Sequence, residues 1–162
     1  MSKKLLYEKL TAELTSLLGD ETDIIANCAN AAALLGRMLP EINWVGFYFL
    51  RRDVLIVGPF FGKPACTRIP VGKGVCGKAV EQRKSLVVPD VRLFPGHIAC
   101  DAASRSEIVV PLMRDDRIWG VLDVDSPKEE RFDEADRFGL ERVAEVVCSH
   151  SELPEGPCIV PG

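Results

Sequence analysis

The sequence predicts an α+β domain with a mainly antiparallel β-sheet. The 162 residues suit one domain with its own hydrophobic core, and neither an internal repeat nor a linker divides them. The expected elements run helix, helix, strand, strand, helix, strand, strand, strand, helix. Because the long helices gather at the two ends of the chain, they favour a segregated layout over alternating parallel βαβ units.

Leucines at helical spacing predict a first helix over residues 4–18, which Gly19 ends. Thr22 is expected to cap a second helix, which Pro40 ends. The inner faces are expected to hold Leu6, Leu10, Leu14, Leu17 and Leu18 in the first helix, and Ile25, Cys28, Ala29, Ala32, Leu35 and Leu39 in the second.

The middle of the chain reads as strands separated by two long loops. An aromatic run at residues 43–50 predicts a central strand, since aromatic residues are enriched in sheets. The further expected elements are a strand at 54–58, an irregular loop at 59–77, a short helix at 78–83, a strand at 85–88, a second loop at 89–105, and a hairpin of strands 107–112 and 118–125. Loops of this length in a compact domain are usually functional, and we expect them on the sheet side away from the terminal helices.

Asp133 is expected to cap a final helix whose inner residues are Ala135, Phe138, Val143, Val146 and Val147. Residues 1–150 then form the domain. Residues 151–162 are rich in proline and glycine and are expected to form a loose C-terminal tail.

Composition narrows the classes of function. The net charge is −4 and no run of Lys or Arg occurs, so nucleic acid and anionic membrane surfaces are not favoured as partners. No apolar stretch approaches the length of a membrane span, and no apolar region of signal-peptide length follows the two lysines of the N-terminus. We interpret the chain as a cytoplasmic protein whose six cysteines are mostly reduced at rest.

Three cysteines, Cys66, Cys76 and Cys100, lie in stretches that read as loops, and no C-x-x-C pair accompanies them. A thiolate that attacks an electrophile needs a second thiol to resolve the product, and loops supply mobile backbone. The pattern indicates dithiol redox chemistry, with small buried hydrophobic residues as the alternative. The other three cysteines are expected to be structural or incidental: Cys28, Cys148 and Cys158.

Carboxylates on the final hairpin form the second candidate group. Along the last strand Trp119, Val121, Asp123 and Asp125 share one face by the period of two. A three-residue hairpin loop would place Glu107 opposite Asp123, whereas a two-residue loop would place it on the other face. Clustered carboxylates retain a proton and can bind an ammonium group. The alternative is that the two aspartates are ordinary surface or turn residues.

Three further features carry weaker signals. Trp44 could hold an apolar group in a pocket, or it could be a core residue. The G-x-G-x-x-G match at positions 72, 74 and 77 lacks the βαβ context of a dinucleotide site and predicts a turn into a short helix. His97 could tune Cys100, but neither His97 nor His150 makes a usual zinc spacing with the cysteines. No metal or cofactor is therefore expected.

Taken together, these motifs resemble the free methionine-(R)-sulfoxide reductases, a family of GAF domains. The resemblance extends from about Leu5 to Val147 and rests on residues 43–48, 58–66, 72–77, 89–91, 94–101, 104–111 and 120–127. It implies a GAF fold with a central antiparallel sheet, terminal helices on one face, and a ligand pocket under long loops on the other.

The resemblance also implies roles for single residues. Cys100 would be the attacking thiol, Cys66 the main resolving thiol and Cys76 an auxiliary partner. The substrate-binding residues would be Trp44, Glu107, Asp123 and Asp125. The implied substrate is free L-methionine-(R)-S-oxide, the implied reductant is thioredoxin, and a homodimer is plausible. A non-catalytic GAF sensor of a small ligand and a thiol-based redox sensor stay open as alternatives.

Overall fold

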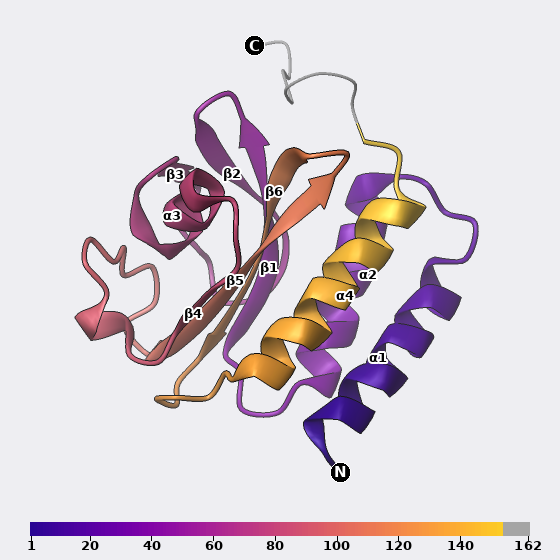
Figure 1. The fold of residues 1–162 in the computed structure, drawn as a ribbon, viewed down its shortest axis with the longest axis horizontal. Coiled ribbons are helices and arrows are strands. Elements are labelled where there is room, and N and C mark those ends of the chain that lie inside the picture. Colours follow the sequence, from indigo (N-terminus) through magenta and orange to yellow (C-terminus); the bar gives the residue numbers. More distant parts are fainter. Residues whose placement is uncertain (154–162) are drawn as a thin grey trace.

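A six-stranded antiparallel sheet separates three helices from the segments that carry Cys66, Cys76 and Cys100 (Figure 1). The computed structural model describes residues 1–153. The predicted tail beyond Leu153, with Cys158, lies outside the described residues. The elements are α1 (Lys3–Leu18), α2 (Ile24–Met38), β1 (Trp44–Arg51), β2 (Val54–Gly62), β3 (Arg68–Pro70), α3 (Gly74–Gln82), β4 (Leu86–Val88), a 3-10 turn (Val91–Leu93), β5 (Ser106–Arg114), β6 (Arg117–Ser126) and α4 (Glu134–His150).

The strands lie in the order β3-β2-β1-β6-β5-β4, with every neighbouring pair antiparallel. Helices α1, α2 and α4 cover one face, and α3 with the two long loops covers the other (Figure 1). Each face has its own apolar core. Phe47 and Leu122 point toward the helices, whereas Tyr48 and Val121 point toward α3. The predicted α+β class and its division into a helix side and a loop side are confirmed.

Helix boundaries follow local capping. Gly19 ends α1 with a positive φ of 51°, as predicted, because glycine adopts this backbone region without strain. The predicted cap Thr22 is wrong by one residue. Asp23 caps α2 instead, since its side chain accepts a hydrogen bond from the Ala26 amide.

Several helical side chains face solvent where the sequence predicted core. Leu17, Ile25 and Phe138 are 49%, 52% and 62% exposed, and Ala29 and Ala135 are exposed as well. These residues are apolar but lie beside the buried stripe of their helix. In α1 that stripe is Tyr7, Leu10, Leu14 and Leu18, and in α4 it is Gly139, Leu140, Val143, Ala144 and Val147. Each stripe keeps the spacing of three and four residues that one helix face requires.

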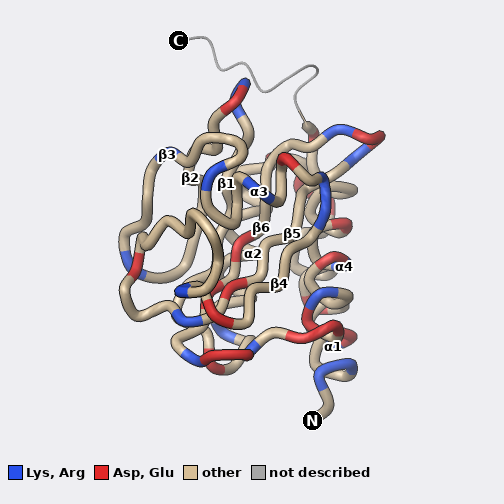
Figure 2. The backbone as a smooth tube through the Cα atoms, turned by 60° about the vertical axis from the view of Figure 1, so that its left-hand side comes forward, with Lys and Arg blue, Asp and Glu red and all other residues tan. Residues whose placement is uncertain are grey.

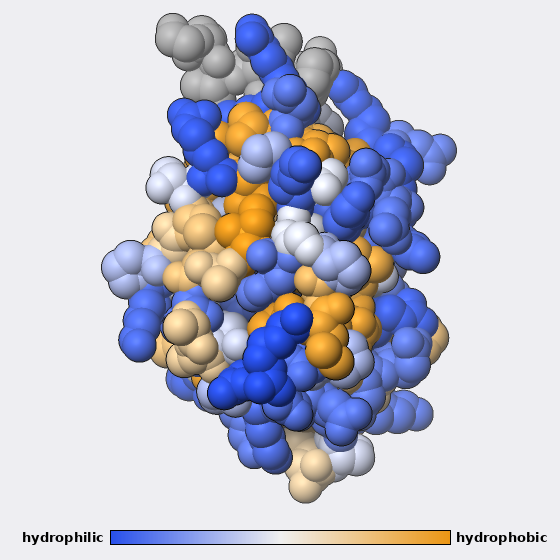
Figure 3. Space-filling view, turned by 90° about the vertical axis from the view of Figure 1, so that its left-hand side faces the viewer, coloured by the Kyte–Doolittle hydropathy of each residue, from blue (hydrophilic) through white to orange (hydrophobic). Residues whose placement is uncertain are grey.

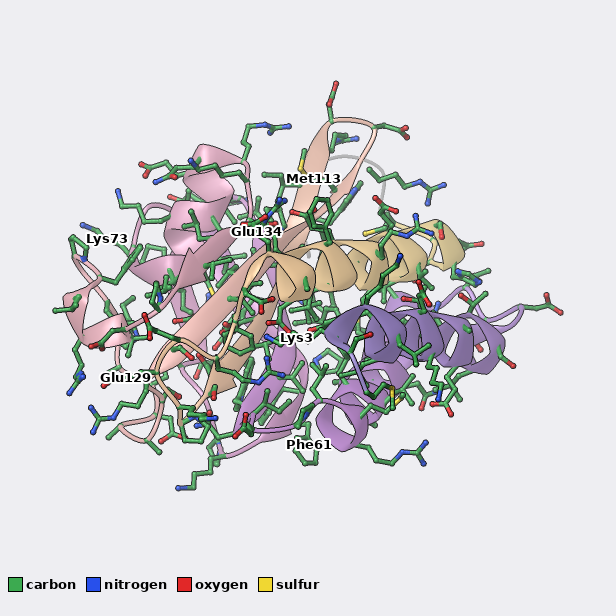
Figure 4. The ribbon with its side chains drawn as sticks, turned by 60° about the horizontal axis from the view of Figure 1, so that its bottom comes forward. Lys3, Phe61, Lys73, Met113, Glu129 and Glu134 are labelled. Atoms are coloured by element: carbon green, nitrogen blue, oxygen red, sulfur yellow. A yellow bond between two sulfur atoms is a disulfide. The ribbon has the colours of Figure 1, made fainter. Side chains whose placement is uncertain are left out.

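Helices α1 and α4 are joined by a buried polar cluster. Figure 4 shows Lys3 at the start of α1, beside the first turn of α4. There Asp136 is fully buried and accepts hydrogen bonds from Lys3 Nζ, Tyr7 Oη and Arg131 Nη1. Asp133 and Asp136 also form a capping box, as the predicted cap at Asp133 requires. The cluster therefore fixes the start of α1 to the start of α4.

Regular structure extends into the segment that was predicted to be irregular. Strand β2 continues to Gly62, and the short edge strand β3 pairs with residues 54–56. Helix α3 begins at Gly74, which places Cys76 on a helix and not in a loop. Strand β3 has only three residues, and the first turn of α3 is rich in glycine. Neither leaves a periodic apolar pattern, so neither could be predicted from the sequence.

The hairpin between β5 and β6 combines a tight turn with a β-bulge. Its loop has the two residues Asp115 and Asp116, both with positive φ, as two-residue hairpin turns require. The register then shifts between Leu112 and Met113, so Trp119 becomes the extra residue. Glu107 consequently pairs with Asp125, and not with Asp123 as predicted. The predicted face of Trp119 is also wrong, since Trp119 packs in the core under the helices.

Charges are interspersed over the molecule. Figure 2 shows acidic and basic residues mixed along the helices and at the loop tips. Many are paired within one helix, as Arg137 is with Glu134 and Glu141 in α4. Among residues 1–153, no helix is long and apolar enough to cross a membrane.

Candidate active site

A cavity lies between the sheet, α3 and the two long loops, on the face away from the terminal helices. Six of the seven predicted site residues line it: Trp44, Cys76, Cys100, Glu107, Asp123 and Asp125. The seventh, Cys66, is bonded to Cys100. Figure 3 shows this side of the molecule, where apolar patches alternate with hydrophilic residues. The sequence thus identified residues that come together from β1, β5, β6, α3 and both loops.

Three carboxyl groups stand side by side on the central strands. Glu107 on β5 is paired with Asp125 on β6, and Asp123 lies two residues before Asp125 on the same strand. Asp125 is half-buried, whereas the other two side chains are buried. Glu107 and Asp123 are each 6% exposed. The bulge at Trp119 keeps all three carboxyls on the cavity side despite the two-residue loop.

Burial and mutual repulsion raise the pKa values of the three carboxyl groups. Burial, followed by the charge of Asp123, raises the pKa of Glu107 and of Asp125 well above their ordinary values. Burial raises the pKa of Asp123 to about 6, while hydrogen bonds from Glu107 and Cys76 oppose the rise. The cavity therefore holds carboxylic acids that can donate a proton near neutral pH.

Cys66 and Cys100 form a disulfide with their Cα atoms 5.4 Å apart, which joins the β2–β3 connection to the loop before β5. Cys100 is exposed and Cys66 is half-buried. The Cys66 carbonyl accepts a hydrogen bond of 3.0 Å from Tyr48 Oη, which anchors the first loop to β1. The two cysteines that the sequence singled out are thus close enough for thiol exchange.

Cys76 lies deeper in the cavity, in the first turns of α3. Its Sγ is 4.0 Å from Glu107 Oε1, and it is buried. Burial, with the neighbouring carboxylates, raises the pKa of this thiol well above its ordinary value. His97 Nε2 lies 3.8 Å from Glu107 Oε2, and burial lowers the pKa of His97. His97 therefore contacts the acid cluster directly, a contact that its sequence position near Cys100 did not indicate.

Trp44 forms an aromatic wall of the cavity. It is 4% exposed, and its Nε1 donates a hydrogen bond of 3.1 Å to the Lys63 carbonyl. Its ring stacks on Phe60 at 5.3 Å and lies 5.9 Å from the ring of Tyr48. These contacts fix the indole in an orientation that presents an apolar surface to the cavity.

Three polar residues beside the cavity, Asn43, Asp101 and Ser104, were not among the predicted site residues. Asn43 Nδ2 donates to Asp101 Oδ2 at 3.2 Å and to Ser104 Oγ at 3.1 Å, and the two acceptors line the cavity. These bonds hold the second loop against the start of β1. The only signal in the sequence was that Asn43, Asp101 and Ser104 fall within the family-like stretches. As predicted, Cys28 and Cys148 are buried away from this site, under the helices.

The fold and site define a GAF-type domain whose pocket combines a thiol pair with buried acids. Residues 6–150 match the model of the family described as GAF domain. The chain is 50% identical over 143 residues to the free methionine-R-sulfoxide reductase of Escherichia coli (strain K12), covering 88% of this chain and 87% of that protein. It is 39% identical over 155 residues to the enzyme of that name from Saccharomyces cerevisiae, covering 91% and 86%.

A solved structure agrees with these relatives. The free methionine-R-sulfoxide reductase of Neisseria meningitidis, in complex with its substrate, superposes with a TM-score of 0.89 at 45% identity, covering 93% of this chain and 90% of that one. The chain belongs to the free methionine-R-sulfoxide reductase family of GAF domains.

Proposed function

We propose that this chain reduces free L-methionine-(R)-S-oxide to L-methionine, with Cys100 as the attacking thiol. One observation carries the assignment: Cys100 and the carboxyl groups of Glu107, Asp123 and Asp125 line the same cavity, and Cys100 is bonded to Cys66. A sulfoxide sulfur becomes electrophilic when its oxygen is protonated. The cavity supplies both the nucleophile and the acid that this reaction needs.

The reaction balances with the residues present. The Cys100 thiolate attacks the sulfoxide sulfur while a carboxylic acid of the cluster protonates the oxygen. Methionine leaves, and Cys100 keeps the oxygen as a sulfenic acid. The Cys66 thiol then attacks the Cys100 sulfur, which forms the disulfide and releases water. The two electrons come from the two thiols, so an external dithiol must restore them. We propose thioredoxin for this step, and Cys76 as an auxiliary thiol.

The same residues account for a preference for the free amino acid. Ionised members of the acid cluster can bind the ammonium group, which a methionine within a peptide lacks. The fixed indole of Trp44 offers a surface for the substrate methyl group. A pocket that encloses the whole free amino acid would not admit a residue whose chain continues from both ends.

The test is an assay of methionine formation from the R and S epimers with a thioredoxin system. We expect turnover of the free R epimer only, and none with the Cys100→Ser variant. Cys28→Ala is a suitable control, because Cys28 is buried under the helices. Methionine formed by Cys100→Ser would overturn the assignment. Binding without turnover by the unaltered chain would favour a sensor. The homodimer stays a prediction that sedimentation measurements can check.

A further inference from the structure

We propose that the disulfide-bonded form of this protein binds one thiophilic divalent cation between Cys76, Glu107 and Asp123. Zn²⁺ is the probe for this class of ligand. The inference goes beyond the reductase reaction and does not depend on it, because it rests on the geometry of a form in which Cys66 and Cys100 are already bonded.

The three side chains offer a converging set of ligand atoms. One atom from each of Cys76, Glu107 and Asp123 lies within 4.8 Å of the other two, and all three residues are buried. Thiolate and carboxylate ligands bind zinc at about 2.3 and 2.0–2.2 Å, which places tetrahedral ligand atoms roughly 3.5 Å apart. Small rotations of these side chains would therefore close them around an ion. The three residues come from α3, β5 and β6, so the backbone already fixes their approach.

An unpartnered atom points to a missing ligand in this cluster. Asp123 Oδ1 is buried and has no hydrogen-bond partner among residues 1–153. A buried oxygen without a partner carries a desolvation penalty of about 1–3 kcal/mol, and more when it is charged. Since Asp123 lines the cavity, an ion there would satisfy this atom.

His97 can supply a fourth ligand. Its side chain is 17% exposed, and its Nε2 lies 3.8 Å from Glu107 Oε2 at the edge of the same cavity. Together with the thiol and two carboxylates it would complete the four-coordinate set that zinc prefers. The sequence positions 76, 97, 107 and 123 match no zinc spacing, so only the fold brings this set together.

The disulfide-bonded form favours an ion over an amino acid as occupant. Its cavity measures about 40 Å³. That volume accommodates an ion or a few water molecules, since one water needs roughly 10–15 Å³ on this scale. Pockets that enclose small-molecule ligands are typically about 300 Å³ or larger. With Cys66 and Cys100 bonded to each other, Cys76 is the thiol that remains available in the cavity.

The test is a Zn²⁺ titration of the oxidised full-length chain in competition with a chromophoric zinc indicator. A Cys158→Ser background removes the thiol of the tail. We expect one Zn²⁺ per chain, and a loss of affinity of roughly 100-fold or more in Cys76→Ser and in Asp123→Asn. Even residues that only orient a metal ligand are worth about 10–100-fold. Cys148→Ala is the matched control, because Cys148 is buried under the helices, and it should bind like the background.

Co²⁺ gives a second readout that needs no variant. In the background protein it should produce a thiolate-to-cobalt charge-transfer absorption, and the band should disappear in Cys76→Ser. Far-UV circular dichroism checks that each variant is folded. Zinc affinity that is unchanged in a folded Cys76→Ser, or the absence of both binding and the cobalt band at micromolar metal, would overturn the proposal. Neither result bears on the reductase activity, since the titration involves no turnover.

Discussion

Glu107 and Asp125 are carboxyl groups whose native surroundings favour the protonated form. Burial, and then the charge of Asp123, raises the pKa of each. The unfolded chain would release these protons at an ordinary carboxyl pKa of about 4. The native state therefore binds more protons than the unfolded state between that pH and the raised pKa. Its stability must fall as the pH rises through this window.

Replacing Glu107 by glutamine, a neutral isostere of the protonated acid, should remove its share of this loss. Each unit by which the native pKa exceeds the unfolded pKa corresponds to at most about 1.4 kcal/mol. We expect urea unfolding of Glu107→Gln to show a smaller loss of stability between pH 5 and pH 8 than the unaltered chain. Glu8→Gln, at an exposed position of α1, is the control and should keep the original dependence. Parallel pH profiles for both variants would contradict a raised pKa at Glu107.

In the proposed mechanism, one of the same carboxyl groups donates the proton to the sulfoxide oxygen. We expect Asp125→Asn to slow methionine formation by on the order of 10²-fold or more if Asp125 is the general acid. The measurement is the single-turnover rate with reduced enzyme, which isolates the chemical step from disulfide reduction. An unchanged rate would transfer the role to Glu107 or Asp123, both of which line the cavity.

Replacing Cys66 should affect the reaction differently from replacing Cys100. Cys66→Ser retains the attacking thiol, so one equivalent of methionine per chain should form from reduced protein. Steady-state turnover with thioredoxin should fall strongly, because the sulfenic acid at Cys100 has lost its bonded partner. Quantifying methionine per chain, with and without the thioredoxin system, checks both statements. Normal steady-state rates would argue that Cys76 resolves equally well.

At the scale of elements, the β5–β6 hairpin shows which features could be predicted from the sequence and which could not. Alternation correctly placed Asp123 and Asp125 on one face, since a period of two is a local property. The bulge was not visible, because it depends on how Trp119 packs under the helices. The shorter loop and the bulge each shift the predicted register by one residue, and a total shift of two leaves Glu107 on its predicted face. Trp119 lies at the bulge itself, so its predicted face was wrong.

Other features could not be predicted from the sequence because they depend on contacts between different elements. The cysteines and acids could be selected from residue type and family resemblance, but not the contact of His97 with Glu107, which joins residues on different elements. Cys76 was assigned to a loop because the glycines before it mask the start of α3. Apolar residues such as Ile25 and Phe138 were assigned to the core from their type, whereas helix orientation leaves them exposed.

Gly120 allows the bulged hairpin to lie close to β1. A Cβ atom there would lie 2.0 Å from the Tyr48 carbonyl oxygen, a backbone atom that no side-chain rotation can move. We expect Gly120→Ala to destabilise the fold by roughly 2–4 kcal/mol, the range of severe single substitutions. Gly96→Ala is the control, because no atom lies within 4 Å of its Cβ position. The positive φ of 74° is then the remaining source of strain for an alanine at this position, and it should cost about 1 kcal/mol. Equal unfolding midpoints for the two variants would contradict this packing.

At the scale of the whole molecule, the sheet separates the core under the terminal helices from the cavity on its other face. Its helix face carries the larger apolar core, whereas its other face combines a second apolar core with the acids and thiols, under segments that the disulfide ties together. The disulfide spans 34 residues. In the chain-entropy model a loop of that size contributes about 3–4 kcal/mol by restricting the unfolded chain. Oxidation should thus stabilise the fold while it closes the cavity.

If the disulfide closes the cavity, the oxidised protein should bind methionine only weakly. The cavity of about 40 Å³ in the disulfide-bonded form is far below the roughly 300 Å³ of typical ligand pockets. Cys100→Ser cannot form this bond but keeps the acids and Trp44. We expect methionine to bind Cys100→Ser at least tenfold more tightly than it binds the oxidised unaltered chain, as measured by isothermal titration calorimetry. Oxidised Cys28→Ala controls for loss of a cysteine and should bind as weakly as the oxidised unaltered chain. Equal affinities for Cys100→Ser and the oxidised chain would mean that the loops open without reduction, and the disulfide would then not control access to the acids.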